Sequence, residues 1–505
     1  MQLAPQRADT RTSNAALVEK YDAVAYAAQS NALSHPDHMA VVATLFGLEP
    51  ADVATCRVLE LGCSDGANLL PMAANLPNAS FVGCDLSPRA IAAARSAVAE
   101  LGLSNVALFD GDLSALPEAL GDFDYMIAHG VYSWVPASVR DAMFTLAQRR
   151  LKRNGILFVS YNVYPGCHVR QAVWESLRFH IEHIEGAPAR LGAARAFAAA
   201  LAEPGTTQNP IDALLRQEFK RIAQVTDSAL YHDDLAEPND PVYFREFATH
   251  AARYDLRFVA EAKLSTTAAD TSPAMQRFFG GRGRLEREQL LDLAQLRRFR
   301  QSLLSRADSA TGFAIAHERV ALMRIGASVS LMRAAAEGKP IVDPEDAPAG
   351  DEAKVLQSLF EWMIAIAPET LPVSEIAARL AWPQAAPGTP RALDAILTDA
   401  CVRGSLRPTL HPPPLVAVAG DRPKATAYAR WQAGHGIAIT NLQHETMQVR
   451  DASALRLLRL LDGSRTRGEL ATAMADALPG GEPPRVAQRI DEYLAQFGKL
   501  ALLVA

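Results

Sequence analysis

The chain has 505 residues, of which 49% are hydrophobic and 21% are charged, and its formal net charge is −6. This length exceeds what one hydrophobic core usually supports and predicts several domains. A mildly acidic chain argues against general nucleic-acid binding, which depends on basic residues that neutralise phosphates, and no run of about 18 apolar residues predicts a membrane span.

Residues 1–48 are predicted to form an N-terminal helical segment, with helix over 15–48. Pro36 suits the first turn of a helix that ends near Gly47. Because the domain that follows does not need this segment, we expect it to be a lid over a ligand site, with a solvated helix turn as the alternative. The residues expected to close over the ligand are Tyr21, Tyr26 and His35.

Residues 49–166 alternate short apolar runs with alanine- and leucine-rich helical stretches. This alternation predicts an α/β fold with a parallel sheet and helices on both faces. The predicted strands are Val58–Leu61, Phe81–Cys84, Val106–Phe109, Tyr125–Ala128 and Ile156–Tyr161, and the predicted helices include Ser87–Leu101 and Ala137–Leu151.

Residues 167–240 interrupt this alternation and are predicted to form a helical insertion, with a break at Pro204-Gly205-Thr206-Thr207. Residues 241–310 are predicted to complete the core. Their predicted elements are a helix over Phe244–Tyr254, a strand over Leu256–Leu264, an amphipathic helix over Leu285–Phe299 and the last strand over Arg300–Leu304.

Residues 311–420 and 421–505 are predicted to form a middle and a C-terminal module, both resembling winged helices. Residues 338–351 have the composition of a linker. In the C-terminal module, the predicted elements are paired strands over Ile437–Leu442 and Met447–Arg450, followed by a helix over Ser453–Leu461.

The turn after the first predicted strand carries the clearest functional signal. Glu60 precedes Gly62 and Gly66, which let the backbone approach a ligand closely. Asp85 ends the second strand, 23 residues beyond Gly62, where an acidic residue accepts ribose hydroxyls. Asp112 follows the third strand, where an adenine amino group needs an acceptor.

These acidic residues distinguish two classes of nucleotide-binding fold. A pyrophosphate binder usually has G-x-G-x-x-G, whereas this turn has E-x-G-x-x-x-G, with a carboxylate that suits an ammonium group. S-adenosylmethionine carries an ammonium group and no phosphate. A generic dinucleotide-binding fold without methyl chemistry is the alternative.

Residues 57–161 resemble a class I S-adenosylmethionine-dependent methyltransferase with a seven-stranded, Rossmann-like sheet. Ser64 stands where that family often has glycine. The resemblance implies that S-adenosylmethionine is the cofactor, that Glu60, Gly62 and Gly66 surround its methionine part, that Asp85 holds its ribose and that Asp112 with Leu113 holds its adenine. We also expect five further cofactor-binding residues, which are Tyr26, His35, Cys63, Leu86 and His129.

A narrower resemblance is to bacterial methyltransferases with a methyltransferase regulatory domain, among them the rickettsial-type lysine methyltransferases of outer-membrane proteins. Arg245 stands where the family commonly has histidine, and Cys167 where it has a bulky aromatic residue. The segments that carry the resemblance are Tyr21-Asp22…Tyr26…His35-Pro36, His129–Pro136, Tyr161–Gly166, Pro241–Phe247 and Arg297–Leu304.

His129–Pro136 follows the fourth predicted strand, whose carboxyl end faces the methyl group in this fold. We expect His129, Tyr132 and Trp134 to be the catalytic residues, because Tyr132 and Trp134 can present aromatic faces to a sulfonium or an ammonium. The alternative for Trp134 is packing against the helix that begins at Ala137.

The favoured function is methylation of lysine side chains of a protein. The alternatives are N- or O-methylation of a small molecule and a non-catalytic cofactor-binding regulator.

We expect no nucleic-acid partner, and a homodimer is compatible with the sequence. We expect no metal site, since His35 and His38 have no third ligand nearby. Five cysteines without a CxxC pair and a polar start without an apolar signal region predict a cytoplasmic protein.

Overall fold

The computed structural model describes residues 18–19, 22–24, 26, 28–204, 209–266, 273–309, 312, 314–341, 351–380, 392–477 and 483–505. Tyr21, residues 205–207 of the predicted break and residues 342–350 of the predicted linker lie outside this set.

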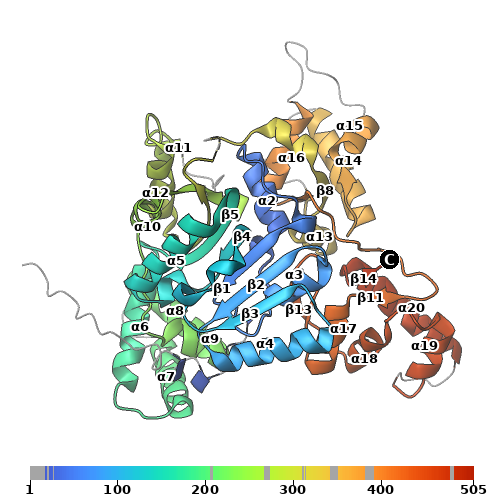
Figure 1. Ribbon diagram of the computed structural model, residues 1–505, viewed down its shortest axis with the longest axis horizontal. Coiled ribbons are helices and arrows are strands. Elements are labelled where there is room, and N and C mark those ends of the chain that lie inside the picture. Colours follow the sequence, from blue (N-terminus) through green and yellow to red (C-terminus); the bar gives the residue numbers. More distant parts are fainter. Residues whose placement is uncertain are drawn as a thin grey trace, which may run out of the picture.

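A seven-stranded sheet forms the centre of the molecule (Figure 1). Its strand order is β3-β2-β1-β4-β5-β7-β6; all strands are parallel except β7, which is antiparallel to both neighbours. This confirms the predicted α/β fold and its methyltransferase-type sheet. The strands are β1 (Arg57–Leu61), β2 (Ser80–Asp85), β3 (Val106–Asp110), β4 (Phe123–Ala128), β5 (Leu151–Asn162), β6 (Leu256–Glu261) and β7 (Phe299–Arg306).

Both faces of the sheet are buried under helices. Successive strand residues alternate between two cores, so Val58 and Phe81 belong to one and Leu59 and Val82 to the other. The helices around the sheet are α2 (Pro36–Leu45), α3 (Leu69–Asn75), α4 (Pro88–Leu101), α5 (Ala137–Arg150), α10 (Phe244–Ala252), α11 (Pro273–Gln276) and α12 (Arg284–Gln295).

The N-terminal segment is less helical than expected. Within 15–48, the longest helix is α2, preceded by a 3-10 turn over Ala32–Ser34, and the described residues between 26 and 31 have no helix. The side chain of Asn31 caps the 3-10 turn and the side chain of His35 caps α2. Both residues have extended backbone, and each cap fixes the residue after which the helical turn begins. The predicted helix over Leu285–Phe299 is also too long, because Leu296 turns to φ +49° and Phe299 already belongs to β7.

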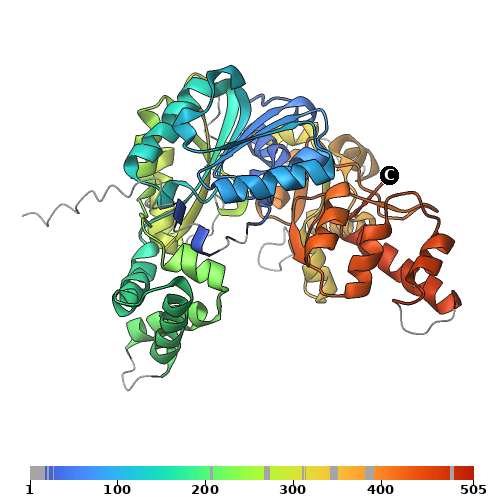
Figure 2. The same ribbon diagram turned by 60° about the horizontal axis from the view of Figure 1, so that its bottom comes forward.

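The insertion is helical, as predicted, and has a small core of its own. Figure 2 shows it extending below the sheet, with the modules of the C-terminal half on the other side. Its helices are α6 (Cys167–Ile181), α7 (Ala187–Ala202), α8 (Pro210–Gln224), α9 (Asp227–Ala229) and the π-helix η6 (Leu230–Asp234).

The middle module is built on an antiparallel sheet in the order β10-β8-β9. It is joined to α2 because Asp37 accepts hydrogen bonds from the hydroxyl of Thr409 and the backbone of Leu410 and His411. Its elements are β8 (Arg324–Ala327), α13 (Val329–Ala336), α14 (Asp351–Ile366), β9 (Leu371–Pro372), α15 (Val373–Leu380), α16 (Leu393–Val402) and β10 (Leu406–Thr409).

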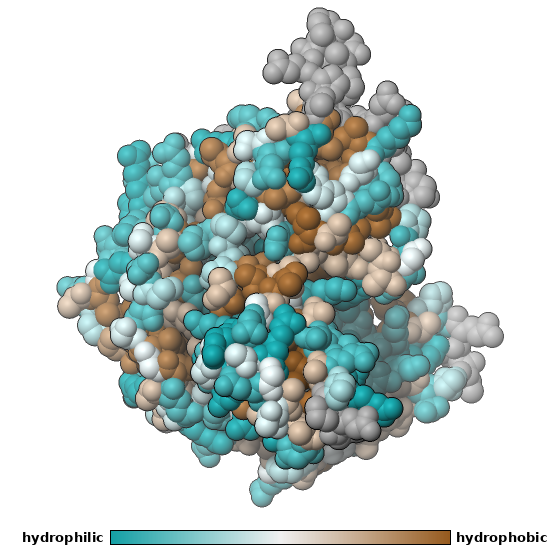
Figure 3. Space-filling view, turned by 90° about the vertical axis from the view of Figure 1, so that its right-hand side faces the viewer, coloured by the Kyte–Doolittle hydropathy of each residue, from teal (hydrophilic) through white to brown (hydrophobic). Residues whose placement is uncertain are grey.

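The C-terminal module contains the predicted strand pair and the helix after it. Ile439 of β12 lies opposite Met447 of β13. Figure 3 shows this side of the molecule, with hydrophobic residues gathered mainly in its upper half. The elements are β11 (Lys424–Ala425), α17 (Ala427–His435), β12 (Ala438–Thr440), β13 (Thr446–Gln448), α18 (Ala452–Leu460), α19 (Arg467–Met474), α20 (Pro483–Lys499) and β14 (Leu503–Val504).

Short 3-10 turns complete the described structure, and none of its helices has the length and apolar character needed to cross a bilayer. The turns not yet given are η2 (Val53–Thr55), η3 (Leu113–Ala115), η4 (Glu118–Leu120), η5 (Tyr132–Trp134), η7 (Leu264–Thr266) and η8 (His317–Leu322).

Candidate functional site

The turn between β1 and α3 has the backbone conformation that its glycines predict. Gly62 and Gly66 have φ of +73° and +82°, and a Cβ at Gly62 would lie 2.7 Å from a methyl group of Val131. Ser64 also has a positive φ, +49°, which explains why glycine suits this position. The turn therefore leaves backbone exposed at the carboxyl end of β1.

Glu60 lies beneath this turn and is only 3% exposed. Its Oε1 accepts a hydrogen bond of 2.7 Å from Asn68 Nδ2, while Oε2 has no hydrogen-bond partner among the described residues. Burial raises the pKa of Glu60 to about 8. A buried carboxylate oxygen without a partner is costly, and a cationic donor would satisfy it.

Asp85, on the neighbouring strand, is held by the backbone of two loops. Its Oδ2 accepts from Ser64 N at 2.8 Å and its Oδ1 from Ser87 N at 2.9 Å. Burial raises its pKa. Each oxygen has a second lone pair, so the carboxylate can accept hydrogen bonds from a pair of hydroxyls.

Asp112 follows β3, so Glu60, Asp85 and Asp112 lie on or just after three adjacent strands of the sheet. Its Oδ1 caps the turn η3 by accepting from the backbone N and the hydroxyl of Ser114. The predicted neighbours Leu86 and Leu113 are half-buried beside these carboxylates in the sequence.

Cys63 lies in the glycine turn, where its backbone N donates to Cys84 O and its backbone O accepts from Gly66 N. Its side chain is buried in the protein, where Sγ would lie 2.8 Å from a Cβ placed on Gly83 of β2. Burial raises the pKa of the thiol well above its usual range. The side chain of Cys63 is therefore part of the packing beneath the turn, and the expectation that Cys63 binds the cofactor stays a prediction.

His129 lies at the end of β4 and bonds to β5. Its Nδ1 is 2.9 Å from Ser160 Oγ, which also accepts from Gly130 N, and 3.5 Å from Asn31 Nδ2. Both neighbours offer donors, so Nδ1 is the acceptor and the proton resides on Nε2. Burial lowers the pKa of His129 to about 4, and the ring is neutral at physiological pH.

Described residues of the N-terminal segment bond to residues near the carboxyl ends of β1 and β2. Asp22 accepts from the hydroxyl of Ser87, and the backbone N of Asn31 donates to Asn68 Oδ1. Tyr26 is 47% exposed and its ring meets the edge of His232 in the insertion. Figure 2 shows the first part of this segment next to the insertion.

His35 has a more local role than expected. Its Nδ1 accepts from Asp37 N and so caps α2, and its ring lies 5.2 Å from the ring of His444. Burial lowers its pKa to about 4. His35 therefore joins the N-terminal segment to the C-terminal module near the site.

Tyr132 does not have the open environment that an amine-binding residue needs. It is 2% exposed, its ring packs against Phe247, and its hydroxyl lies 2.9 Å from His250 Nδ1. Apolar residues of α5 and α10 surround it because this face of the sheet is core. Trp134, in the same turn, is half-buried.

Sequence reasoning missed four residues that the fold brings to the site, and only one of them had a signal. Asn68 lies at the start of the helix after the glycine turn, where a polar residue close to Glu60 is expected. Asn31, Ser160 and His444 come from distant segments without a motif.

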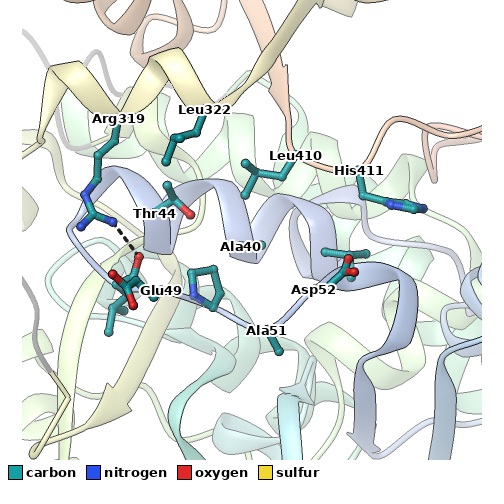
Figure 4. A pocket seen from close by; sticks show the side chains of 12 residues that line it. Ala40, Thr44, Glu49, Ala51, Asp52, Arg319, Leu322, Leu410 and His411 are labelled. Atoms are coloured by element: carbon teal, nitrogen blue, oxygen red, sulfur yellow. Dashed lines mark hydrogen bonds between the residues drawn. The ribbon is translucent and has the colours of Figure 1, made fainter. Parts of the chain in front are cut away.

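One cavity of the described structure lies away from these residues. It has a volume of about 330 Å³ between α2, the loop before β1 and the turn η8 (Figure 4). Residues 48–53 of its lining precede β1, so it opens near the amino end of that strand. Within the described ranges, no group of three or more His, Cys, Asp or Glu side chains could hold a metal ion.

Three family models match the chain. They are a methyltransferase domain over residues 58–155, a predicted methyltransferase regulatory domain over 226–306 and the C-terminal winged helix domain of PKMT over 421–491. The middle module, residues 311–420, falls between the matched segments.

Two uncharacterized proteins of Rickettsia prowazekii are similar to the chain. One is 34% identical over 57% of this chain and 53% of its own length; the other is 33% identical over 46% of this chain and 94% of its own length. The chain thus spans about half the length of the first relative and nearly all of the second.

The solved structure of PKMT2 from Rickettsia typhi covers 95% of this chain and 100% of its own, with a TM-score of 0.81 and 23% identity. At this identity the match establishes a common fold over nearly the whole chain, including the modules of the C-terminal half.

Proposed function

The chain belongs to the S-adenosylmethionine-dependent methyltransferases that carry a methyltransferase regulatory domain, and from this premise we propose that it methylates lysine side chains of a protein substrate. The observation that carries the proposal is the match of residues 421–491 to the C-terminal winged helix domain of PKMT, where PKMT stands for protein lysine methyltransferase. This module accompanies the catalytic sheet in a solved structure named as a PKMT, over the full length of that protein.

The residues at the carboxyl end of the sheet fit S-adenosylmethionine. Glu60 Oε2, buried and without a partner in the described chain, would accept from the ammonium group of the cofactor. Asp85 would accept from the ribose hydroxyls, and Asp112 with Leu113 would hold the adenine. When bound, the cofactor supplies an electrophilic methyl group on a sulfonium.

The protein's part in the reaction is alignment, because methyl transfer is an in-line displacement. A free lysine amine has a pKa of about 10.4 and must arrive neutral. Burial beside a positive sulfonium lowers that pKa, so no dedicated base is required. His129 stays neutral and adds no further positive charge, and within the described residues its Nε2 makes no hydrogen bond, which leaves a donor for a ligand.

A cytoplasmic location is part of the same proposal. It is supported by the five cysteines, all of which are buried free thiols.

The test is incubation of the full chain with methyl-labelled S-adenosylmethionine and a bacterial lysate, followed by mass spectrometry. We expect methyl-lysine on a protein, and less label with the variant Asp85→Ala at a cofactor concentration below its Kd. Label confined to small molecules would overturn the protein substrate and favour small-molecule methylation. Absence of any labelled product, with no binding of the cofactor, would overturn methyl transfer itself.

A further inference from the structure

The hairpin of the C-terminal module reaches the cofactor site from the far end of the sequence. Its turn, residues 441–445 between β12 and β13, carries His444, which is 3% exposed. His444 Nε2 lies 2.8 Å from Asn68 Oδ1, and Asn68 Nδ2 donates to Glu60 Oε1 at 2.7 Å. One amide therefore separates His444 from the carboxylate that fits the cofactor's ammonium group.

The hydrogen bonds of Asn68 fix the orientation of its amide. Oδ1 accepts from His444 Nε2 and from Asn31 N, each at 2.8 Å. Nδ2 donates to Ser34 Oγ at 3.1 Å and to Glu60 Oε1 at 2.7 Å. A flipped amide would place two donors against Asn31 N and turn an oxygen toward Glu60. The bond to Glu60 thus depends on the donors that face Oδ1.

The turn holds the His444 ring in one place. Asn441 Oδ1 accepts from the backbone N of Gln443 and of Glu445, both at 2.9 Å. His444 has φ +61°, and its ring packs beside His35. The rest of the module is seated against the core, since α17 contacts α3 and α4 (Figure 1). The module thus presents one N–H donor to Asn68.

We propose that His444 is a positioning residue of the cofactor site: through Asn68 it holds the Glu60 carboxylate so that Oε2 faces the ammonium group of the cofactor. The C-terminal module thereby completes the part of the site that binds the methionine moiety. This inference rests on the proposed function, because it requires that the cofactor bind at Glu60.

The test compares two ligands that differ in the group His444 is inferred to serve. S-adenosylhomocysteine carries the amino-acid part with its ammonium, whereas 5′-methylthioadenosine lacks it. Binding of both to the full chain is measured by calorimetry. His444→Gly removes the ring without a penalty at positive φ. We expect it to weaken binding of S-adenosylhomocysteine about tenfold, as for the loss of a well-made buried hydrogen bond, and to leave 5′-methylthioadenosine unaffected.

Two further variants separate positioning from general packing. His444→Gln keeps an N–H donor of similar reach and is expected to restore most of the affinity for S-adenosylhomocysteine. His435→Ala is the matched control, because His435 lies in the same module and makes an exposed contact, 3.3 Å from Glu100 on α4, outside the network. It should change neither affinity.

The outcomes that contradict the inference differ from those that contradict the proposed function. An equal loss for both ligands in His444→Gly would mean that the ring only seats the module, and unchanged affinities would remove it from the site; either result overturns the inference. A wild-type chain that binds neither ligand would instead overturn the proposed function.

Discussion

At the scale of single residues, Glu60 makes cofactor binding depend on protons. Burial holds its pKa at about 8, so near pH 6.5 the carboxyl is mostly protonated, and an ammonium group beside it would favour the charged form. We expect binding of S-adenosylhomocysteine at pH 6.5 to release about one proton, measured by calorimetry in buffers of different ionisation enthalpy. Glu60→Gln should abolish the release. A buffer-independent enthalpy in the wild type would contradict this assignment.

The raised pKa of Glu60 also makes the stability of the free protein depend on pH. For stability the protonated carboxyl is the favourable form, whereas cofactor binding favours the charged form. Because the folded pKa of Glu60 lies above its unfolded value, the folded state binds the proton more tightly. Its contribution is fully present at pH values below the unfolded pKa and is lost as the pH rises through about 8. Chemical unfolding at pH 5 and pH 8 should show this loss in the wild type and a smaller one in Glu60→Gln.

Asp85 should affect affinity more than the number of protons released, because burial, and only secondarily the charge of Asp85, raises the pKa of Glu60. The carboxylate of Asp85 already accepts from Ser64 N and Ser87 N, so the loop backbone orients it before the ligand binds. Loss of a charge-assisted hydrogen bond costs about 1.5–3 kcal/mol, and we expect Asp85→Ala to weaken cofactor binding at least about tenfold. Calorimetry at pH 6.5 should still detect the proton released by Glu60. Unchanged affinity in a folded variant would exclude Asp85 from the site.

At the scale of elements, the N-terminal segment can be tested as a lid. Residues 36–45 belong to the buried helix α2, whose Asp37 is bonded to the middle module, so a deletion must stop before them. Removing residues 1–30 eliminates the contact of Asp22 with Ser87 and of Ser30 with Thr446. We expect a chain that unfolds at a similar temperature but turns over slowly. Full turnover in the truncated chain would show that the segment is not a lid and only packs against the rest of the protein.

Helices and strands were predicted more accurately where neighbouring residues determine them than where contacts with distant residues do. The strand–helix alternation placed the ends of β1 to β4 within two residues, because apolar runs bounded by turns are the signal of buried parallel strands, but it missed the first five residues of β5. Helix was predicted over 15–48, yet residues 28–31 have no helix, and the backbone N of Asn31 donates to Asn68 Oδ1 instead of to a carbonyl of a helical turn. Tertiary contacts override local propensity there.

At the scale of the whole molecule, the candidate site combines segments that a motif cannot connect. Glu60 and Asp85 could be named from their spacing, whereas His444 is 376 positions from Asn68 and no local pattern marks it. The sequence also did not reveal that the side chain of Tyr132 is buried. Tyr132 follows β4, as a site residue would, but residues of α5 and α10 surround it. Sequence alone gives the order of elements and not the side chains that tertiary packing brings to them.

The bond between His444 and Asn68 also orders events while the chain is being made. Glu60, Asn68 and Asn31 leave the ribosome early, and they can form their mutual contacts as soon as the sheet begins to assemble. The donor that completes the Asn68 amide is added only after another 376 residues have been synthesised. For most of the time that the chain is being synthesised, Asn68 Oδ1 therefore lacks the hydrogen bond from His444.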